Sequence, residues 1–338
     1  MKAIVFDEPG GPENLSVRIV DDPVCKENQV IIDIKFAALN HLDLWVRKSP
    51  TYAASTPHVG GSDGSGTISE IGTKVKNLNL GDRVLINPGF SCGNCRYCYM
   101  GEQSSCDSFK IMGAGPWGTE AEKIAVDAKN VLKIPDNITF EVAAAAPLTF
   151  ITVYRMLATK GNVQPGETVL VTGGGGGIGT VAIQMAKAMK AKVIVLTSTD
   201  KIEAVHQLGA DVVINYLETP DWENEVINEG GADVIIESVG EKTWGKSIKV
   251  LNKRGRLVTI GATTGALGET EIRELYRKQA SIHGSFMGSN EDFLKSMNFL
   301  FDGSVKPVID SVFKLSDARL AHERLETGKH IGKILLQV

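Results

Sequence analysis

Four cysteines lie close together in the first third of the chain. Cys92, Cys95, Cys98 and Cys106 follow the pattern C-x2-C-x2-C-x7-C. Four thiolates at this spacing can surround one tetrahedral zinc ion, and they leave no coordination position open to a substrate. An iron–sulfur cluster and a disulfide pair are the alternatives for such a set. We interpret it as a structural zinc site, with one zinc per chain, and the remaining Cys25 as an inert thiol.

A second candidate site is the glycine-rich stretch at residues 168–189. A short apolar run ends at Thr172, five glycines follow, and apolar residues then recur at helical spacing. This order predicts a strand, a tight turn and a helix. Glycines in the pattern G-x-G-x-x-G permit the turn, the approach of a pyrophosphate and close helix packing, and the helix N-terminus attracts phosphate. The residues expected to bind a dinucleotide here are Gly174, Gly176, Gly177, Ile178 and Gly179.

The choice between NAD and NADP depends on the strand that follows this helix. In dinucleotide-binding folds, an acidic residue about 20 positions beyond the last glycine binds the ribose hydroxyls of NAD. Here that region reads Ser198, Thr199, Asp200 and Lys201. Two hydroxyls and a cation suit a 2′-phosphate, so we expect NADP(H) to be favoured over NAD(H). The alternative is that Asp200 turns towards the ribose and serves NAD.

The elements that position these residues indicate two domains. The first is β-rich, as the alternating pattern of residues 30–38 shows. In the second, strands are expected at 192–197, 212–214, 233–237, 256–260 and 280–285, which with the strand before the glycines makes six. We predict an α/β protein with a β-rich domain at 1–143 and 286–338, and a doubly wound, parallel six-stranded Rossmann domain at 144–285.

Composition excludes several classes of partner. The 338 residues carry a formal net charge of −4 without a long basic run. We therefore expect a small-molecule substrate, and neither nucleic acid nor a membrane as a partner. No apolar run reaches the length of about 18 residues that a membrane span needs. Because the cysteines are clustered and the N-terminus reads as a strand, we expect a cytoplasmic location.

Together the motifs resemble those of the medium-chain dehydrogenase/reductase superfamily, which includes zinc alcohol dehydrogenases and quinone oxidoreductases. The resemblance covers essentially the whole chain. Besides the four cysteines, it rests on ALNHLDLW (38–45), GSDGSG (61–66), AAAPLTFITVY (144–154), TGGGGGIG (172–179) and GRLVTIGA (255–262). It implies that the β-rich domain is a GroES-like catalytic domain, and that the protein forms a homodimer or homotetramer.

The chain departs from the zinc alcohol dehydrogenases at the catalytic metal. Asn40, Ser62 and Leu148 stand at the positions that match the three zinc ligands of that family. None of them is a good zinc ligand, and a leucine side chain cannot coordinate a metal at all. The carboxylate that accompanies the family's histidine ligand is present, in shortened form, as Asp63.

The proton relay of these enzymes is also missing, since Leu42 and Trp45 stand at the positions of its hydroxyl and its histidine. The substitutions instead resemble the quinone oxidoreductase and enone reductase branch. This resemblance implies hydride transfer from NADPH to a conjugated enone or quinone without a catalytic metal. The alternatives are an alcohol dehydrogenase that rebuilds a metal site from Asp63, His58 or Asp43, and a non-catalytic NADP(H)-binding sensor.

The resemblance also assigns individual roles. Asn40 is expected to donate to the substrate oxygen or the nicotinamide ribose, and His41 to contact the cofactor pyrophosphate. Asp43 is expected to order the site or to cap the following helix. The expected catalytic residues are Asn40, Asp43, Tyr52, Ser62 and Asp63. The remaining expected cofactor contacts are Thr152, Gly240 and Gly261.

Overall fold

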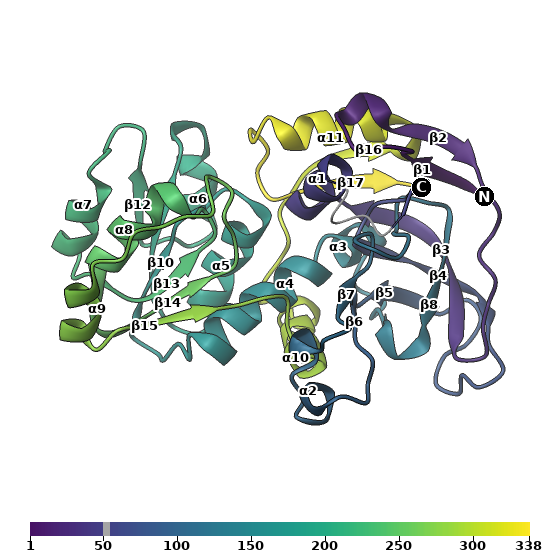
Figure 1. The fold of residues 1–338 in the computed structure, drawn as a ribbon, viewed down its shortest axis with the longest axis horizontal. Coiled ribbons are helices and arrows are strands. Elements are labelled where there is room, and N and C mark those ends of the chain that lie inside the picture. The colour runs from purple at the N-terminus through teal and green to yellow at the C-terminus, as the bar shows by residue number, and fades with distance from the viewer. Residues whose placement is uncertain (50–54) are drawn as a thin grey trace. The chain divides into compact units, whose positions relative to one another are not determined.

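The structure is a computed structural model that describes residues 1–49 and 55–338, so the candidate residue Tyr52 lies outside the described residues. The chain forms two compact units, which Figure 1 colours from purple to yellow along the sequence. The first unit comprises Met1–Leu148 and Pro307–Val338, and the second comprises Thr149–Lys306. The described residues contain no helix with the length and apolar character needed to cross a membrane.

The first unit is built mainly of strands. A seven-stranded sheet has the order β16-β17-β3-β4-β5-β9, and β8 also pairs with β3. Its strands are β3 (Gln29–Ala38), β4 (Asp63–Ile71), β5 (Arg83–Ile86), β8 (Lys123–Asp127), β9 (Val131–Lys133), β16 (Ile309–Lys314) and β17 (Lys333–Gln337). Two small sheets pair β1 (Lys2–Val5) with β2 (Ser16–Ile19), and β6 (Gly89–Phe90) with β7 (Lys110–Ile111). The helices are α1 (His41–Lys48), α2 (Arg96–Tyr99), α3 (Phe140–Ala144) and α11 (Ala318–Glu326).

Strand β3 is the centre of this sheet, and its end decides where the polar residues meet. Alternating apolar side chains of β3 are buried in the core, as the sequence pattern predicts. At its last residue, Ala38 pairs with Asp63 of β4 on one side and with Leu335 of β17 on the other. The register therefore brings Asn40, two residues beyond β3, close to Asp63 at the start of β4 and to Lys333 at the start of β17.

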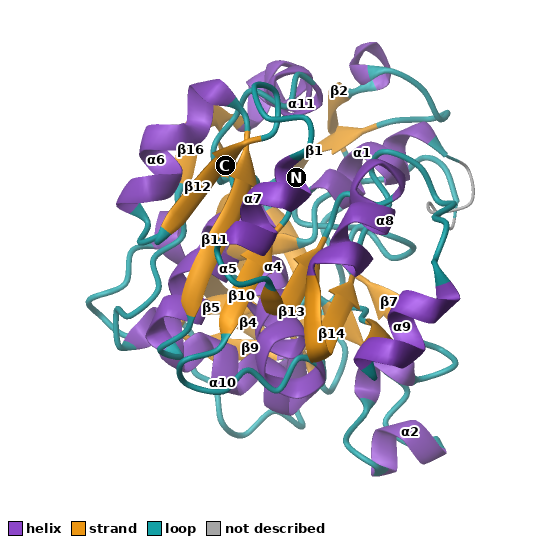
Figure 2. Ribbon diagram, turned by 90° about the vertical axis from the view of Figure 1, so that its left-hand side faces the viewer, coloured by secondary structure: helices purple, strands orange, loops and turns teal. Residues whose placement is uncertain are grey.

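The second unit is a parallel six-stranded sheet with helices, as predicted. Its order is β12-β11-β10-β13-β14-β15. The first three strands therefore follow one another outwards on one side of β10, and the last three follow one another on its other side; Figure 2 shows strands of this sheet in orange. The strands are β10 (Thr168–Val171), β11 (Lys192–Thr197), β12 (Val212–Asn215), β13 (Ala232–Glu237), β14 (Leu251–Thr259) and β15 (Ser281–Gly284). The helices are α5 (Gly177–Ala188), α6 (Ile202–Gln207), α7 (Trp222–Asn228), α8 (Glu241–Val250), α9 (Ile272–Lys278) and α10 (Asn290–Phe301).

The segment of chain that connects the two sheets is helical and breaks at Pro147. Helix α3 ends at Ala144, α4 begins at Pro147 and runs to Tyr154, and a π-helical segment continues over Arg155–Lys160. Proline suits the first position of a helix because it has no N–H to donate and its φ angle is already helical.

Helix α10 belongs to the second unit, so the chain returns to the first unit at Pro307 rather than at residue 286 as expected. A buried ion pair at the N-terminus of α10 attaches this helix to the second unit. Arg155 donates to Asp292 over 2.8 Å, and the Thr159 hydroxyl donates to the same carboxylate over 2.5 Å. Burial alone would raise the pKa of Asp292, but hydrogen bonds from Thr159, from the Ser289 backbone and from Arg155 hold it below its ordinary value.

We expect Asp292→Asn to destabilise the protein by about 3 kcal/mol, because the change leaves the buried Arg155 guanidinium without its counter-charge. Urea unfolding at neutral pH measures the loss. The control is Glu291→Gln in the exposed pair with Lys295 on the same helix, where we expect a loss below about 0.5 kcal/mol. Equal effects of the two changes would contradict the role given to the buried pair.

Candidate functional site

The glycine loop of the second unit has the shape that a pyrophosphate needs. A Cβ atom at Gly179 would lie 2.0 Å from the carbonyl oxygen of Gly173, and one at Gly174 would lie 2.2 Å from Val195. At Gly176, the N-cap of α5, a Cβ would point into open space, with no atom nearer than 4.0 Å. The loop thus packs tightly on its inner side and leaves the helix N-terminus accessible. These residues fit a dinucleotide, whose phosphates would accept from the free N–H groups of α5.

The end of β11 carries both hydroxyls and carboxylates. The Ser198 hydroxyl donates to Asp200 over 2.5 Å, and the Thr199 hydroxyl donates to Glu218 over 3.4 Å. The stem of Lys201 lies against the glycine loop, because a Cβ at Gly175 would lie 2.3 Å from Lys201 Cδ. All the groups that could distinguish a 2′-phosphate from a 2′-hydroxyl are therefore gathered here.

The other expected cofactor contacts of this unit are held in place by hydrogen bonds and close packing. Gly240 has a φ of +94° and donates its N–H to the buried Glu237 carboxylate over 3.0 Å. A Cβ at Gly261 would lie 2.6 Å from a backbone carbonyl oxygen, so this position needs glycine. Thr152 is buried in α4, and its hydroxyl contacts the sulfur of Met287 at 4.0 Å. Their contacts with a cofactor stay predictions.

The four clustered cysteines meet in the first unit, at α2 and the loops beside it. Their Sγ atoms all lie within 4.8 Å of one another, and three of the separations are 3.5, 3.6 and 3.9 Å. A tetrahedron with Zn–S bonds of about 2.3 Å has edges of about 3.8 Å. A disulfide would need about 2.05 Å, and an iron–sulfur cluster would need room for several atoms between the sulfurs. The donor set therefore fits one structural zinc ion.

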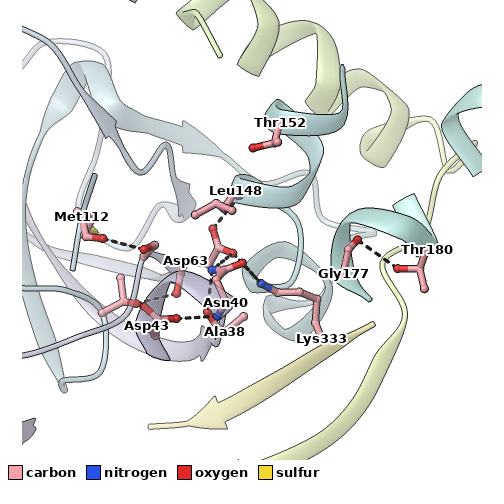
Figure 3. Close-up of polar contacts among 12 residues, drawn as sticks. Ala38, Asn40, Asp43, Asp63, Met112, Leu148, Thr152, Gly177, Thr180 and Lys333 are labelled. Atoms are coloured by element: carbon pink, nitrogen blue, oxygen red, sulfur yellow. Dashed lines mark hydrogen bonds and ion pairs between the residues drawn. The ribbon is translucent and has the colours of Figure 1, made fainter. Parts of the chain in front are cut away.

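A hydrogen-bonded group lies around Asn40, which stands at one of the positions that match the metal ligands of zinc dehydrogenases. Figure 3 shows Lys333 pointing at Asn40 and Asp63. The Lys333 ammonium donates to Asn40 Oδ1, and to Asp63 Oδ2 over 3.1 Å. The Asn40 amide in turn donates to Asp63 Oδ2 over 2.9 Å and to the carbonyl oxygen of Ala38 over 3.4 Å. Both polar atoms of this amide are thus engaged within the first unit, and the contact of Asn40 with a substrate oxygen or the nicotinamide ribose stays a prediction.

The remaining positions of this site also lack metal-binding character. The Ser62 hydroxyl donates to the carbonyl oxygen of Met112 over 2.8 Å, and Leu148 offers only its backbone N–H, which donates to Asp63 Oδ1 over 2.8 Å (Figure 3). His58 is fully buried and donates from Nε2 to the Gly113 carbonyl oxygen, so its contact here is structural. A catalytic zinc does not fit these residues. Within the described part of the chain, only the four cysteines bring three or more Cys, His, Asp or Glu ligand atoms together.

A group of buried ionisable side chains lies beside this arrangement. Asp43 caps α1 by accepting the Asn40 N–H at Oδ2 over 2.6 Å, which is the capping role foreseen as one of two possibilities. Its Oδ1 is buried with no hydrogen-bond partner among the described residues. His322 Nε2 and Glu120 Oε1 lie 3.2 Å apart and are also buried. Burial, together with the charge of Glu120, raises the pKa of Asp43 to about 7.

Sequence reasoning missed three residues of this region, Lys333, Glu120 and His322. The only local signal was a lysine at the start of the otherwise apolar strand β17, in a position that proves to be buried. His41, by contrast, is exposed, and its ring packs edge-on against Trp45 with centroids 5.1 Å apart. Its contact with a pyrophosphate stays a prediction.

Comparisons with known proteins agree with both units. A family profile described as "Alcohol dehydrogenase GroES-like domain" matches residues 26–136, and one described as "Zinc-binding dehydrogenase" matches residues 177–302. The chain is 31% identical to alcohol dehydrogenase 2 of Caenorhabditis elegans, over 99% of this chain and 95% of that protein. It is 30% identical to an acryloyl-coenzyme A reductase of Sulfurisphaera tokodaii over the full length of both. A crystal structure of an NAD-dependent alcohol dehydrogenase superposes over the full length of both chains, with a TM-score of 0.96 and 39% identity.

We expect the purified protein to contain about one zinc atom per chain, because among the residues that the structure describes only the four thiolates form a suitable donor set. Elemental analysis after exhaustive dialysis measures this content. Cys106→Ser should lower both the zinc content and the unfolding midpoint, whereas Cys25→Ser, outside the cluster, should change neither. About two zinc atoms per chain would indicate a second, catalytic site and would contradict the interpretation of Asn40, Ser62 and Leu148.

The raised pKa of Asp43 predicts a stability that falls as the pH rises. An unfolded aspartate has a pKa of about 3.9, whereas the folded-state pKa is about 7. Between these two pH values the folded protein therefore binds one proton more than the unfolded chain. The free energy of unfolding that this proton contributes is fully present below about pH 4, falls as the pH rises, and is lost above about pH 7. We expect Asp43→Asn to remove this slope, which is on the order of 1 kcal/mol per pH unit. Urea unfolding between pH 5 and pH 8 measures it, with the exposed Glu8→Gln as the control; parallel curves for wild type and Asp43→Asn would refute the assignment.

Proposed function

Because the chain belongs to the medium-chain dehydrogenase/reductase superfamily of NAD(P)-dependent oxidoreductases, we propose that it reduces conjugated enones or quinones with NADPH and without a catalytic metal. The observation that carries this proposal is that Asn40, at a position that matches a metal ligand, instead accepts a hydrogen bond from the ammonium of Lys333, which also pairs with Asp63. An alcohol is oxidised in the zinc enzymes with the help of a Lewis acid and a proton exit. At the positions that match these groups, this chain has residues for neither.

A conjugated acceptor does not need that help. Its carbonyl group already polarises the carbon–carbon double bond, so hydride adds to the carbon in the β position and the electron pair moves to the carbonyl oxygen. Bound NADPH supplies the hydride. The chain's task is then to hold the two reactants in line and to stabilise the negative charge that develops on the oxygen. A proton from water completes the saturated ketone at the neighbouring carbon.

The named relatives bear on the substrate in two ways. Several are alcohol dehydrogenases, and one is an acryloyl-coenzyme A reductase. Acryloyl-coenzyme A carries a double bond conjugated to a thioester carbonyl, which makes it an acceptor of the class proposed here. The absence of metal ligands at the matching positions favours this class over simple alcohols, because alcohol oxidation requires a Lewis acid and a proton exit.

The preference for NADPH rests on the hydroxyls of Ser198 and Thr199 and on the ammonium group of Lys201, which suit a 2′-phosphate. The carboxylate of Asp200, which accepts from Ser198, would have to turn away from the phosphate or be balanced by Lys201. If Asp200 accepted from the ribose hydroxyls instead, NADH would be preferred, as the names of several relatives suggest for those proteins. The homo-oligomeric state and the cytoplasmic location stay predictions.

A steady-state screen tests the function. We expect oxidation of NADPH by enones, enoyl thioesters or quinones, with a kcat/KM for NADPH at least about tenfold above that for NADH, a ratio that corresponds to about 1.4 kcal/mol of transition-state binding. Primary and secondary alcohols with NADP or NAD should give no comparable rate, and added zinc or a chelator should leave the enone rate unchanged. Fast oxidation of simple alcohols would refute the proposal, and binding of NADPH without turnover of any acceptor would favour the sensor.

A further inference from the structure

One buried carboxylate lies where three loops of the second unit meet. Glu237 is the last residue of β13 and is 0% exposed. Its strand lies between β10 and β14, and the loops that follow these three strands contain the expected cofactor contacts Gly174, Gly240 and Gly261. In an open parallel sheet a dinucleotide binds at the carboxyl ends of the strands, where the strand order reverses. Here that point lies between β10 and β13, so Glu237 is at the edge of the sheet where the dinucleotide is expected.

The side chain of Glu237 connects β13 with the strand that leads into the glycine loop. The hydroxyl of Thr172, the residue before the five glycines, lies 3.2 Å from Glu237 Oε1 and 3.2 Å from the carbonyl oxygen of Ile236, and it can donate to either. The same hydroxyl oxygen accepts the backbone N–H of Ser238 over 3.2 Å. The last paired residues of the two strands are Val171 and Ile236. These hydrogen bonds therefore join β10 and β13 beyond the end of their pairing.

The same carboxylate also fixes the loop after β13. Glu237 Oε1 accepts the backbone N–H groups of Val239 and Gly240 over 2.8 and 3.0 Å. It accepts the Thr243 hydroxyl over 2.9 Å as well, and Oε2 accepts the Ser247 hydroxyl over 2.9 Å, both from α8. A buried carboxylate needs hydrogen-bond donors in place of water. The carboxylate and its donors therefore hold one another in place.

The loop after β14 is attached to the same group of contacts. The Ile260 backbone N–H donates to the carbonyl oxygen of Glu237 over 3.0 Å. Thr264 donates its backbone N–H and its hydroxyl to the Val239 carbonyl oxygen, each over 2.9 Å. All these donors and acceptors belong to the chain itself, so the contacts order the three loops without using an atom of a cofactor.

We propose that Glu237 is a positioning residue of the dinucleotide site, which holds the loops after β10, β13 and β14 in their binding conformation before the cofactor arrives. A loop that is already ordered loses less conformational entropy when its ligand binds, so pre-organisation raises affinity. Glu237 acts through the backbone and does not itself contact the cofactor. The inference concerns dinucleotide binding and does not depend on which acceptor takes the hydride.

Dinucleotide affinity, measured by calorimetric titration with NADPH and with NADH, tests this role. Glu237→Leu should raise the Kd of the preferred dinucleotide by at least about tenfold, because it removes the acceptor of two buried N–H groups. Glu237→Gln keeps an acceptor oxygen at the position of Oε1, so its Kd should stay within about threefold of wild type. An unchanged Kd in Glu237→Leu would overturn the proposal. An equal loss in both variants would assign the effect to the charge and would overturn it too.

A second carboxylate on the same strand provides the matched control. Asp233, near the start of β13, accepts the Thr168 backbone N–H over 2.9 Å and the Asn252 amide over 3.0 Å. It lies about 13 Å from Glu237 along the strand, at the edge of the sheet away from the expected dinucleotide. Asp233→Leu should lower the unfolding midpoint and leave the Kd unchanged. An equal rise in Kd for Asp233→Leu and Glu237→Leu would mean that a general loss of stability explains both, and the proposal would fail.

Hydrogen exchange tests the pre-organisation itself, without activity or binding. In wild type without added dinucleotide, the backbone amides of Val239 and Gly240 should exchange slowly, and Glu237→Leu should accelerate them by at least about tenfold. Saturating dinucleotide should restore most of the protection in the variant. Fast exchange in wild type that slows only on addition of dinucleotide would show that the cofactor orders this loop, and would overturn the inference. Wild type that binds a dinucleotide but reduces no acceptor would refute the proposed function, whereas the Kd and exchange data would still decide the role of Glu237.

Discussion

The buried carboxylate of Asp63 is the constraint on which the first unit depends. A carboxylate removed from water costs several kcal/mol unless hydrogen bonds and an opposite charge replace its hydration. Asp63 obtains them from three separate parts of the chain, the Asn40 amide, the backbone N–H of Leu148 and the ammonium of Lys333. Asp63 can contact these partners together only with the observed strand order. This one side chain therefore connects the end of β3 with the starts of β4 and β17.

The same constraint organises the electrostatics around the site. Lys333 balances the charge of Asp63, whereas the pKa of Asp43 is raised to about 7 by burial and by Glu120, with His322 and Lys333 offsetting only part of this rise. Its buried Oδ1 faces no hydrogen-bond donor among the described residues. In the resemblance to zinc dehydrogenases, the nearby ligand position is a histidine, and here it is Ser62, which bonds elsewhere. The acidic residue of that motif, Asp63, thus persists as the partner of Lys333.

Buried carboxylates that accept backbone N–H groups recur across both units. Asp43 accepts from the backbone of Asn40, Asp63 from Leu148, and Asp292 from Ser289. Glu237 accepts from the backbone of the loop that contains Gly240, which is one of the expected cofactor contacts. In each case the carboxylate satisfies donors at the start of a helix or turn, where the backbone has no partner of its own. These carboxylates thereby fix the backbone at the expected site positions.

The sequence by itself determined whatever depends on neighbours along the chain. The glycine loop and the four-cysteine lobe are local patterns, and their spacing identified both a dinucleotide site and a zinc site that the structure fits. The parallel sheet followed from the strand–helix rhythm, and the missing ligand at Leu148 followed from the resemblance. Only the tertiary structure showed which cation Asn40 and Asp63 meet, because their contacts with Lys333 span 293 and 270 positions. Periodicity reports which face of an element is buried, whereas the meeting of side chains so far apart depends on strand order and register, which no local pattern encodes.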